Sequence, residues 1–175
     1  MKKIISIIIS IAMCAMLASC GGVKNEVSDT EQPTLIDTMS LEEKVGQILF
    51  VRCVDDEQTD DLMSIKPGGI LMFGRDFEGL TKDEVKEKIQ SYQDKSDIPL
   101  IIGVDEEGGT VVRVSSNPNL ALEKFKSPQE IYNEGGMDAA VENATEKSEL
   151  LLSLGVNMNL APVADVSTNP SDYMY

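Results

Sequence analysis

The apolar residues of the chain follow two patterns that alternate along it. Short continuous apolar runs lie at 48–51, 70–73 and 100–104, and a fourth short stretch at 156–160 alternates apolar residues with Asn. Runs of this length are typical of strands buried on both faces of a parallel sheet. Between the runs, apolar residues recur every three or four positions, which is the spacing of one face of a helix. Alternating strands and amphipathic helices predict an α/β fold built on a parallel sheet.

Capping signals predict where the helices begin and end. Ser40–Glu43 and Thr81–Glu84 each have a hydroxyl residue followed three positions later by Glu, which is a capping box. The pair Ser127–Pro128 is typical of an N-cap followed by proline at the first helical position. A longer helix is predicted over about 137–154, with Gly155 at its C-terminal cap.

The start of the chain has the pattern of an export signal. A cationic segment at 1–3 precedes an apolar run over 4–17. At about 1.5 Å per residue, this run is too short for a hydrocarbon core of roughly 30 Å and has signal-peptide length. The segment LASC at 17–20 resembles a bacterial lipobox, whose cysteine is lipidated and becomes the mature first residue. We therefore predict a lipoprotein signal peptide over 1–19 and lipidation at Cys20; the alternative is an ordinary signal peptide with an incidental cysteine.

Residues 20–34 are predicted to form a flexible tether, because this segment contains two glycines, a proline and few apolar residues. The folded part is then 35–175. Together these features predict an exported protein that is anchored to the bacterial membrane through the lipid on Cys20.

Charge and composition exclude several classes of function. The chain has 30 Asp and Glu residues against 15 Lys and Arg, a formal net charge of −15, which argues against a nucleic-acid partner. It has no His, so it contains neither His-dependent catalytic machinery nor a His-ligated metal site. The acidic cluster within 55–61 lacks the glycine and terminal glutamate of a calcium-binding loop. We interpret it as a solvated helix face and predict no metal site.

Two of the predicted strands end in residues suited to ligand binding. In parallel β/α folds, functional side chains gather at the carboxyl ends of the strands. The third strand runs into Asp105, and Arg113 follows it; the fourth leads to Asp165. A carboxylate accepts hydrogen bonds from sugar-type hydroxyls, and a guanidinium is a planar fork of donors. The alternative for this segment is an acidic turn with a solvated arginine.

Four motifs occur in order along the folded part. They are MSLEEKVGQ at 39–47, PGGILMFGR at 67–75, GVDEEGGTVVR at 103–113 and LGVNMNLAPVADV at 154–166. Together they resemble the N-terminal half of the family 3 glycoside hydrolases, and the Asp-Glu-Glu-Gly-Gly segment with its following Arg is similar to the β-N-acetylhexosaminidase branch. The resemblance covers nearly all of 39–175.

The resemblance implies a TIM-like (β/α)8 barrel, of which this chain carries roughly the first four β/α units. A complete barrel needs roughly 200–250 residues, and the chain has 175. The implied activity is the removal of terminal N-acetylglucosamine from cell-wall or chitin-type glycans, with retention of configuration and without a cofactor. By the same resemblance, Asp105 binds hydroxyls of the terminal sugar, Arg113 binds substrate and Asp165 shapes the site.

The resemblance also implies that the catalytic groups lie outside this sequence. In that branch the nucleophile is an Asp late in the barrel, and the acid/base is a His reached after a Lys-His-x-Pro-Gly-His-Gly type segment; neither occurs in the 175 residues. We therefore expect no catalytic residue in this chain and no hydrolysis by the chain alone. The alternatives are a non-catalytic lipoprotein sugar-binding module and an inactive family member.

Overall fold

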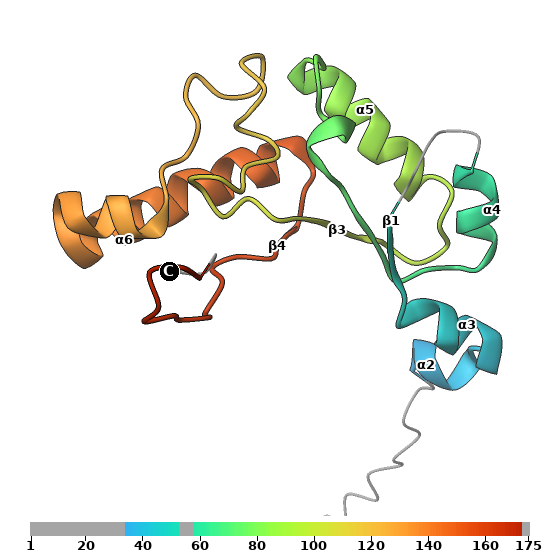
Figure 1. Cartoon of the computed structure of the whole chain (residues 1–175). Helices are drawn as coiled ribbons and strands as arrows, with labels where there is room; N and C mark the ends of the chain where they lie inside the picture. Colours follow the sequence, from blue (N-terminus) through green and yellow to red (C-terminus); the bar gives the residue numbers. More distant parts are fainter. Residues whose placement is uncertain (1–33, 53–57, 173–175) are drawn as a thin grey trace, which may run out of the picture. The chain divides into compact units, whose positions relative to one another are not determined.

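A computed structural model describes residues 34–52 and 58–172 of the chain (Figure 1). The predicted signal peptide, Cys20 and nearly all of the predicted tether lie outside the described residues. The chain divides into two units, 1–37 and 38–175. Helix α2 (Leu35–Thr38) begins where the backbone N–H and hydroxyl of Thr34 donate to Asp37 over 2.8 and 2.7 Å.

The second unit is a four-stranded parallel sheet whose strands are connected through helices. The strand order is β1-β2-β3-β4, and every neighbouring pair is parallel (Figure 1). This confirms the predicted α/β fold. The elements after α2 are α3 (Leu41–Gln47), β1 (Phe50–Arg52), α4 (Thr59–Ser64), β2 (Gly69–Leu71), the 3-10 helix η1 (Gly74–Asp76), α5 (Lys82–Gln93), β3 (Ile101–Val104), α6 (Pro128–Leu154) and β4 (Met158–Asn159).

The helix ends follow the local capping chemistry. Reciprocal capping boxes are present at Ser40, Thr81 and Ser127, where each hydroxyl accepts from the backbone three residues on and the glutamate there accepts in return. Gly155 caps α6 in the left-handed conformation at φ 92°. Helix α6 begins at Pro128 and is interrupted by non-helical backbone at Gly135–Gly136, so the predicted N-cap and the predicted longer helix belong to one kinked element.

The strands are shorter than the apolar runs that predicted them. Ile48 is the C-cap of α3, and β1 begins only at Phe50. Strand β4 covers 158–159 of the predicted 156–160, because the side chain of Asn157 occupies the backbone groups of β3 at that point. Of the acidic segment, residues 55–57 lie outside the described part of the chain, and α4 begins at Thr59.

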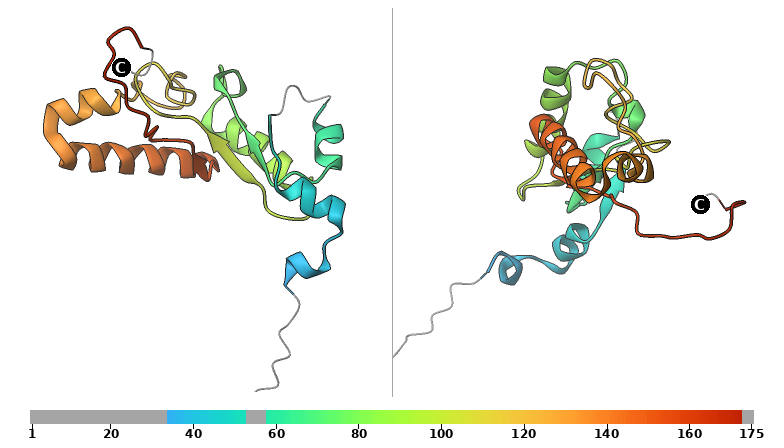
Figure 2. Two further views of the ribbon diagram at one scale, coloured as in Figure 1. Left: turned by 60° about the horizontal axis from the view of Figure 1, so that its bottom comes forward. Right: turned by 90° about the vertical axis from the view of Figure 1, so that its left-hand side faces the viewer.

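The core lies between the sheet and its helices. Alternate strand residues face the helices, so Ile70, Ile102 and Val104 are at most 2% exposed. Val85 and Ile89 of α5 are buried against them, as their spacing predicted. Figure 2 shows α5 and α6 close to each other, and the two helices are in contact. Burying a side chain of this size contributes about 1.5–3 kcal/mol.

The opposite face of the sheet is largely open. Phe50 of β1 lies across two glycines of the neighbouring strands, and a Cβ on Gly103 would come within 2.3 Å of the Phe50 ring. Phe50 remains 38% exposed and Ile101 41% exposed. In a closed barrel this face lines the interior, where it is covered by side chains from the other strands.

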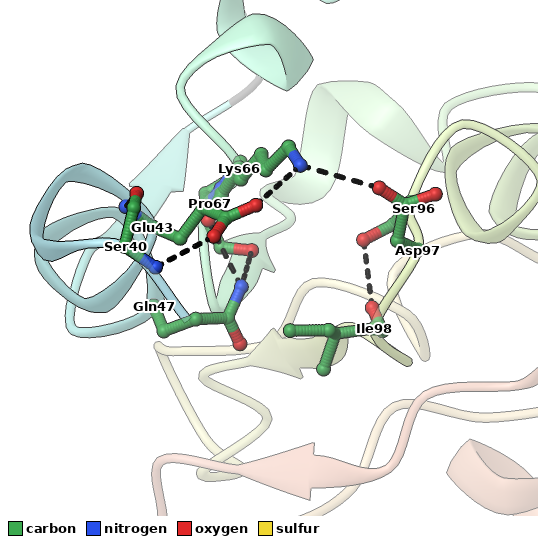
Figure 3. A network of polar contacts seen from close by, with 8 residues as sticks. All are labelled: Ser40, Glu43, Gln47, Lys66, Pro67, Ser96, Asp97 and Ile98. Carbon is green, nitrogen blue, oxygen red and sulfur yellow. Dashed lines mark hydrogen bonds and ion pairs between the residues drawn. The ribbon is translucent and has the colours of Figure 1, made fainter. Parts of the chain in front are cut away.

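A polar network ties α3 to the loop that leads into β2 (Figure 3). Gln47 Nε2 donates to the carbonyls of Lys66 and Pro67 over 2.9 and 3.3 Å. Lys66 Nζ lies 2.7 Å from Glu43 and 3.3 Å from Asp97. These bonds to Glu43 and Asp97 raise the pKa of Lys66, and the bond from Lys66 lowers the pKa of Glu43. The network holds the amino ends of the strands, opposite the predicted site.

Membrane-spanning helices are not found in 34–52 and 58–172, where every helix is too short or too polar to cross a bilayer.

The two outer strands make a prediction about association. Within the described residues, β1 and β4 each pair on one side only. Unpaired parallel edges that carry apolar side chains are templates for intermolecular pairing. We expect the 175-residue chain to associate at micromolar concentration, as measured by light scattering after size exclusion. Met158→Lys on β4 should reduce this association, because a charge blunts an edge strand.

Leu122→Lys is the matched control for that experiment, since Leu122 is fully exposed in a loop and the same charge there should leave association unchanged. A monomer that unfolds in one sharp cooperative transition would contradict the open-edged sheet.

Candidate functional site

The carboxyl ends of β1, β2 and β3 bring three side chains to one edge of the sheet. Arg52 ends β1, Phe73 follows β2, and Asp105 follows β3. The Arg52 guanidinium carbon lies 4.2 Å from the centre of the Phe73 ring, and that of Arg113 lies 5.9 Å from it. At these distances both cations are attracted to the face of the ring. Asp105, Phe73 and the two arginines therefore form one cluster at the strand ends.

Asp105 and Arg113 form a two-point ion pair within this cluster. Arg113 Nε donates to Asp105 Oδ1 over 2.8 Å, and Nη2 donates to Oδ2 over 2.7 Å. The side chains are 28% and 23% exposed for Arg113 and Asp105, so one side of the pair faces solvent. The bonds to Asp105 raise the pKa of Arg113 against the opposing effect of burial. Arg113 is thus ion-paired, which contradicts the alternative of a solvated arginine; substrate binding by the pair stays a prediction.

Glu106 was not among the predicted site residues, yet it organises this segment. Its side chain is fully buried. Oε2 accepts from the backbone N–H groups of Arg113 and Val114 over 2.6 and 2.7 Å. Oε1 accepts from the backbone N–H of Ser115 over 3.2 Å and from the Ser115 hydroxyl. The strand alternation carried the signal, because residue 106 falls on the same buried face as Ile102 and Val104.

Two further side chains fix the backbone between the strand and the pair. Asn159 of β4 accepts from Glu106 N–H over 2.9 Å and donates to its carbonyl over 3.1 Å. Lys147 of α6 donates to the Glu107 carbonyl over 2.7 Å, and its ammonium lies 5.3 Å from the centre of the Phe125 ring. Burial lowers the pKa of Lys147, and the nearby Glu106 and Glu107 partly oppose this. The sheet and α6 thus hold the segment from two sides.

The paired glycines in this segment serve the loop itself. Gly108 and Gly109 have φ of 105° and 64°, the left-handed region that favours glycine. A Cβ on Gly108 would come within 2.2 Å of the Lys126 carbonyl oxygen. This turn therefore packs closely against the chain's own segment 125–127.

Asp165 stands apart from the cluster. It lies in the extended segment after β4, is exposed, and makes no hydrogen bond or ion pair with the other residues of 34–52 and 58–172. Its predicted role in shaping the site stays a prediction. Across the described parts of the chain, no group of three or more His, Cys, Asp or Glu side chains is arranged to hold a metal ion.

Comparison with known proteins identifies the family of the chain. Residues 40–174 match the family described as "Glycosyl hydrolase family 3 N terminal domain". The chain belongs to glycosyl hydrolase family 3. It is 32% identical over 108 residues to beta-hexosaminidase A of Pseudoalteromonas piscicida, covering 60% of this chain and 18% of that protein. It is 30% identical over 103 residues to a beta-hexosaminidase of Bordetella avium strain 197N, covering 57% and 29%. The chain thus spans less than a third of either relative's length.

Solved structures agree with the fold. A glycosyl hydrolase of the GH3 family from Mycobacterium smegmatis aligns with a TM-score of 0.62 at 23% identity, over 77% of this chain and 39% of that one. NagZ from Neisseria gonorrhoeae, solved in complex with zinc ion, aligns with a TM-score of 0.51 at 23% identity, over 69% and 38%. The family-3 chain described here is therefore part of a (β/α) barrel domain, as the sequence motifs predicted.

Proposed function

We propose that the chain is the sugar-binding N-terminal part of a β-N-acetylhexosaminidase, which releases terminal N-acetylglucosamine from cell-wall or chitin-type glycans with retention of configuration. The observation that carries the proposal is the two-point Asp105–Arg113 pair at the strand ends. Membership of family 3 and the two beta-hexosaminidase relatives support this choice of substrate class.

The pair leaves hydrogen-bonding capacity on its exposed side. A carboxylate has about four lone-pair sites, and each Asp105 oxygen accepts one bond from Arg113. A guanidinium has about five N–H donors, of which Arg113 spends two on Asp105. The remaining acceptors and donors suit neighbouring hydroxyls of a sugar ring, which both donate and accept. Arg113 already holds the Asp105 carboxylate in place without a ligand. Binding therefore costs little side-chain conformational entropy at this residue.

Asp105 and Glu106 are unsuited to be the nucleophile. Retaining hydrolysis needs a nucleophile and an acid/base group that flank the scissile bond. Asp105 is occupied by Arg113, and Glu106 is buried with both oxygens accepting from the backbone. The proposal therefore assigns binding to this chain and leaves nucleophile and acid/base to residues outside it.

Replacing Asp105 tests the binding role. Asp105→Ala should weaken N-acetylglucosamine binding about tenfold or more, because hydrogen bonds to a charged group contribute about 1.5–3 kcal/mol each. Calorimetry or ligand-observed NMR on the 175-residue chain measures this.

Asp138→Ala is the control for the Asp105 experiment, since it removes an equal charge from the exposed surface of α6 and should leave affinity unchanged. Equal affinities for wild type and Asp105→Ala would remove Asp105 from the site.

A second prediction concerns hydrolysis. The purified 175-residue chain should release no nitrophenol from an aryl N-acetylglucosaminide, because the groups that attack and protonate the bond are missing. Measurable turnover would overturn the division of roles. If the chain binds sugar, and a longer chain that carries the downstream catalytic segments also shows no turnover, the alternatives of a sugar-binding module or an inactive family member are favoured.

We further propose that the protein is exported and anchored to the bacterial membrane through lipid on Cys20, supported by the LASC segment and the apolar run before it. Expression in a bacterium fed labelled palmitate should give a labelled membrane-bound protein, and Cys20→Ser should abolish both labelling and membrane association. Equal membrane association of the two forms would exclude anchoring at Cys20.

A further inference from the structure

We propose that Glu106 is the positioning residue of the sugar site: its buried carboxylate fixes the backbone at 113–115 and thereby places the Arg113 guanidinium on Asp105. This inference rests on the proposed sugar site, and it assigns to that site a residue that does not touch the sugar.

The first support is how completely the carboxylate is used. Glu106 is 0% exposed, and each of its two carboxylate oxygens accepts two hydrogen bonds. The donors belong to three consecutive residues, Arg113, Val114 and Ser115. An isolated buried carboxylate is strongly unfavourable, and only such a set of donors compensates for its lost hydration. The conformation of 113–115 is therefore tied to the charge of Glu106.

The second support is where those donors lie. One of these donors is the backbone N–H of Arg113, the residue whose side chain forms the ion pair with Asp105. Because Glu106 adjoins Asp105 in the chain, one short segment fixes both ends of the ion pair. Glu106 also acts on Arg113 through space, since its charge helps to raise the pKa of Arg113.

The third support is that Glu106 is itself held rigidly. Asn159 bonds to both its N–H and its carbonyl, and Lys147 bonds to the next carbonyl. Because the backbone of Glu106 is fixed, the groups that its carboxylate binds are also held in fixed positions. Glutamine at 106 keeps the size of the side chain, yet its NH2 group would face backbone N–H donors, and segment 113–115 would have to move.

The experiment measures the state of Arg113 directly, through its rate of modification by phenylglyoxal, followed by peptide mass spectrometry on the 175-residue chain. Glu106→Gln should raise the Arg113 rate at least fivefold relative to the exposed Arg75 in the same sample, which normalises the reagent. An unchanged circular dichroism spectrum reports that the variant is folded. The same variant should weaken N-acetylglucosamine binding at least tenfold, as Asp105→Ala does.

Asn157→Ala is the matched structural control. Asn157 makes the same kind of paired bonds to β3 backbone, from Ile102 N–H and to the Leu100 carbonyl, at the other end of the strand. Its loss should lower the melting temperature and leave Arg113 modification unchanged. Ser115→Ala removes only one donor to Glu106 and serves where Glu106→Gln does not fold; it should raise the Arg113 rate by a smaller factor.

Unchanged Arg113 modification in a folded Glu106→Gln or, where that variant does not fold, in Ser115→Ala would overturn the positioning role. So would a raised rate with undiminished sugar affinity, provided that Asp105→Ala does weaken binding. If Asp105→Ala leaves sugar affinity unchanged while Glu106→Gln raises Arg113 modification, the proposed sugar site fails and the placement of Arg113 by Glu106 is supported.

Discussion

The buried Glu106 carboxylate is the interaction on which the strand-end site depends. Its desolvation is compensated only when three successive backbone N–H groups and one hydroxyl converge on it. To meet this requirement, the loop after Glu106 must bring residues 113–115 back against the Glu106 side chain, a conformation that local propensity does not specify. Asn159 and Lys147 bring β4 and α6 into the same arrangement. The site is therefore built by tertiary contacts among charged and amide side chains, not by the loop alone.

The sheet explains why side-chain amides take part in these contacts. In a parallel sheet, backbone hydrogen bonds between neighbouring strands satisfy the N–H and C=O groups inside the strands, but β3 and β4 pair over only a short stretch. Asn157 and Asn159 continue it with side-chain amides, one at each end of the short strand. An amide both donates and accepts, so each asparagine replaces a missing backbone partner. Asn157 and Asn159 are thus part of the framework.

Sequence patterns predicted what is decided locally and missed what is decided by long-range contacts. The capping boxes at Ser40, Thr81 and Ser127 were predictable because both partners lie within one turn. The strand limits were not, since an apolar run continues into residues such as Ile48 that cap a helix instead. Four ordered motifs predicted the family fold, and one of them, at 103–113, contains both Asp105 and Arg113. The role of Glu106 needed the position of 113–115, which only the folded chain supplies.

The charge state of the site bears on the kind of ligand it suits. The chain is strongly acidic, at −15 overall, yet two arginines meet on the Phe73 ring at the strand ends. Arg113 is neutralised by Asp105 through two bonds, so this pair presents donors and acceptors without a net charge. A neutral, rigid array of hydrogen-bonding groups discriminates by the geometry of hydroxyls and not by attraction at a distance. Under the proposed function, this neutral pair suits the hydroxyl groups of an uncharged sugar through its hydrogen-bonding geometry.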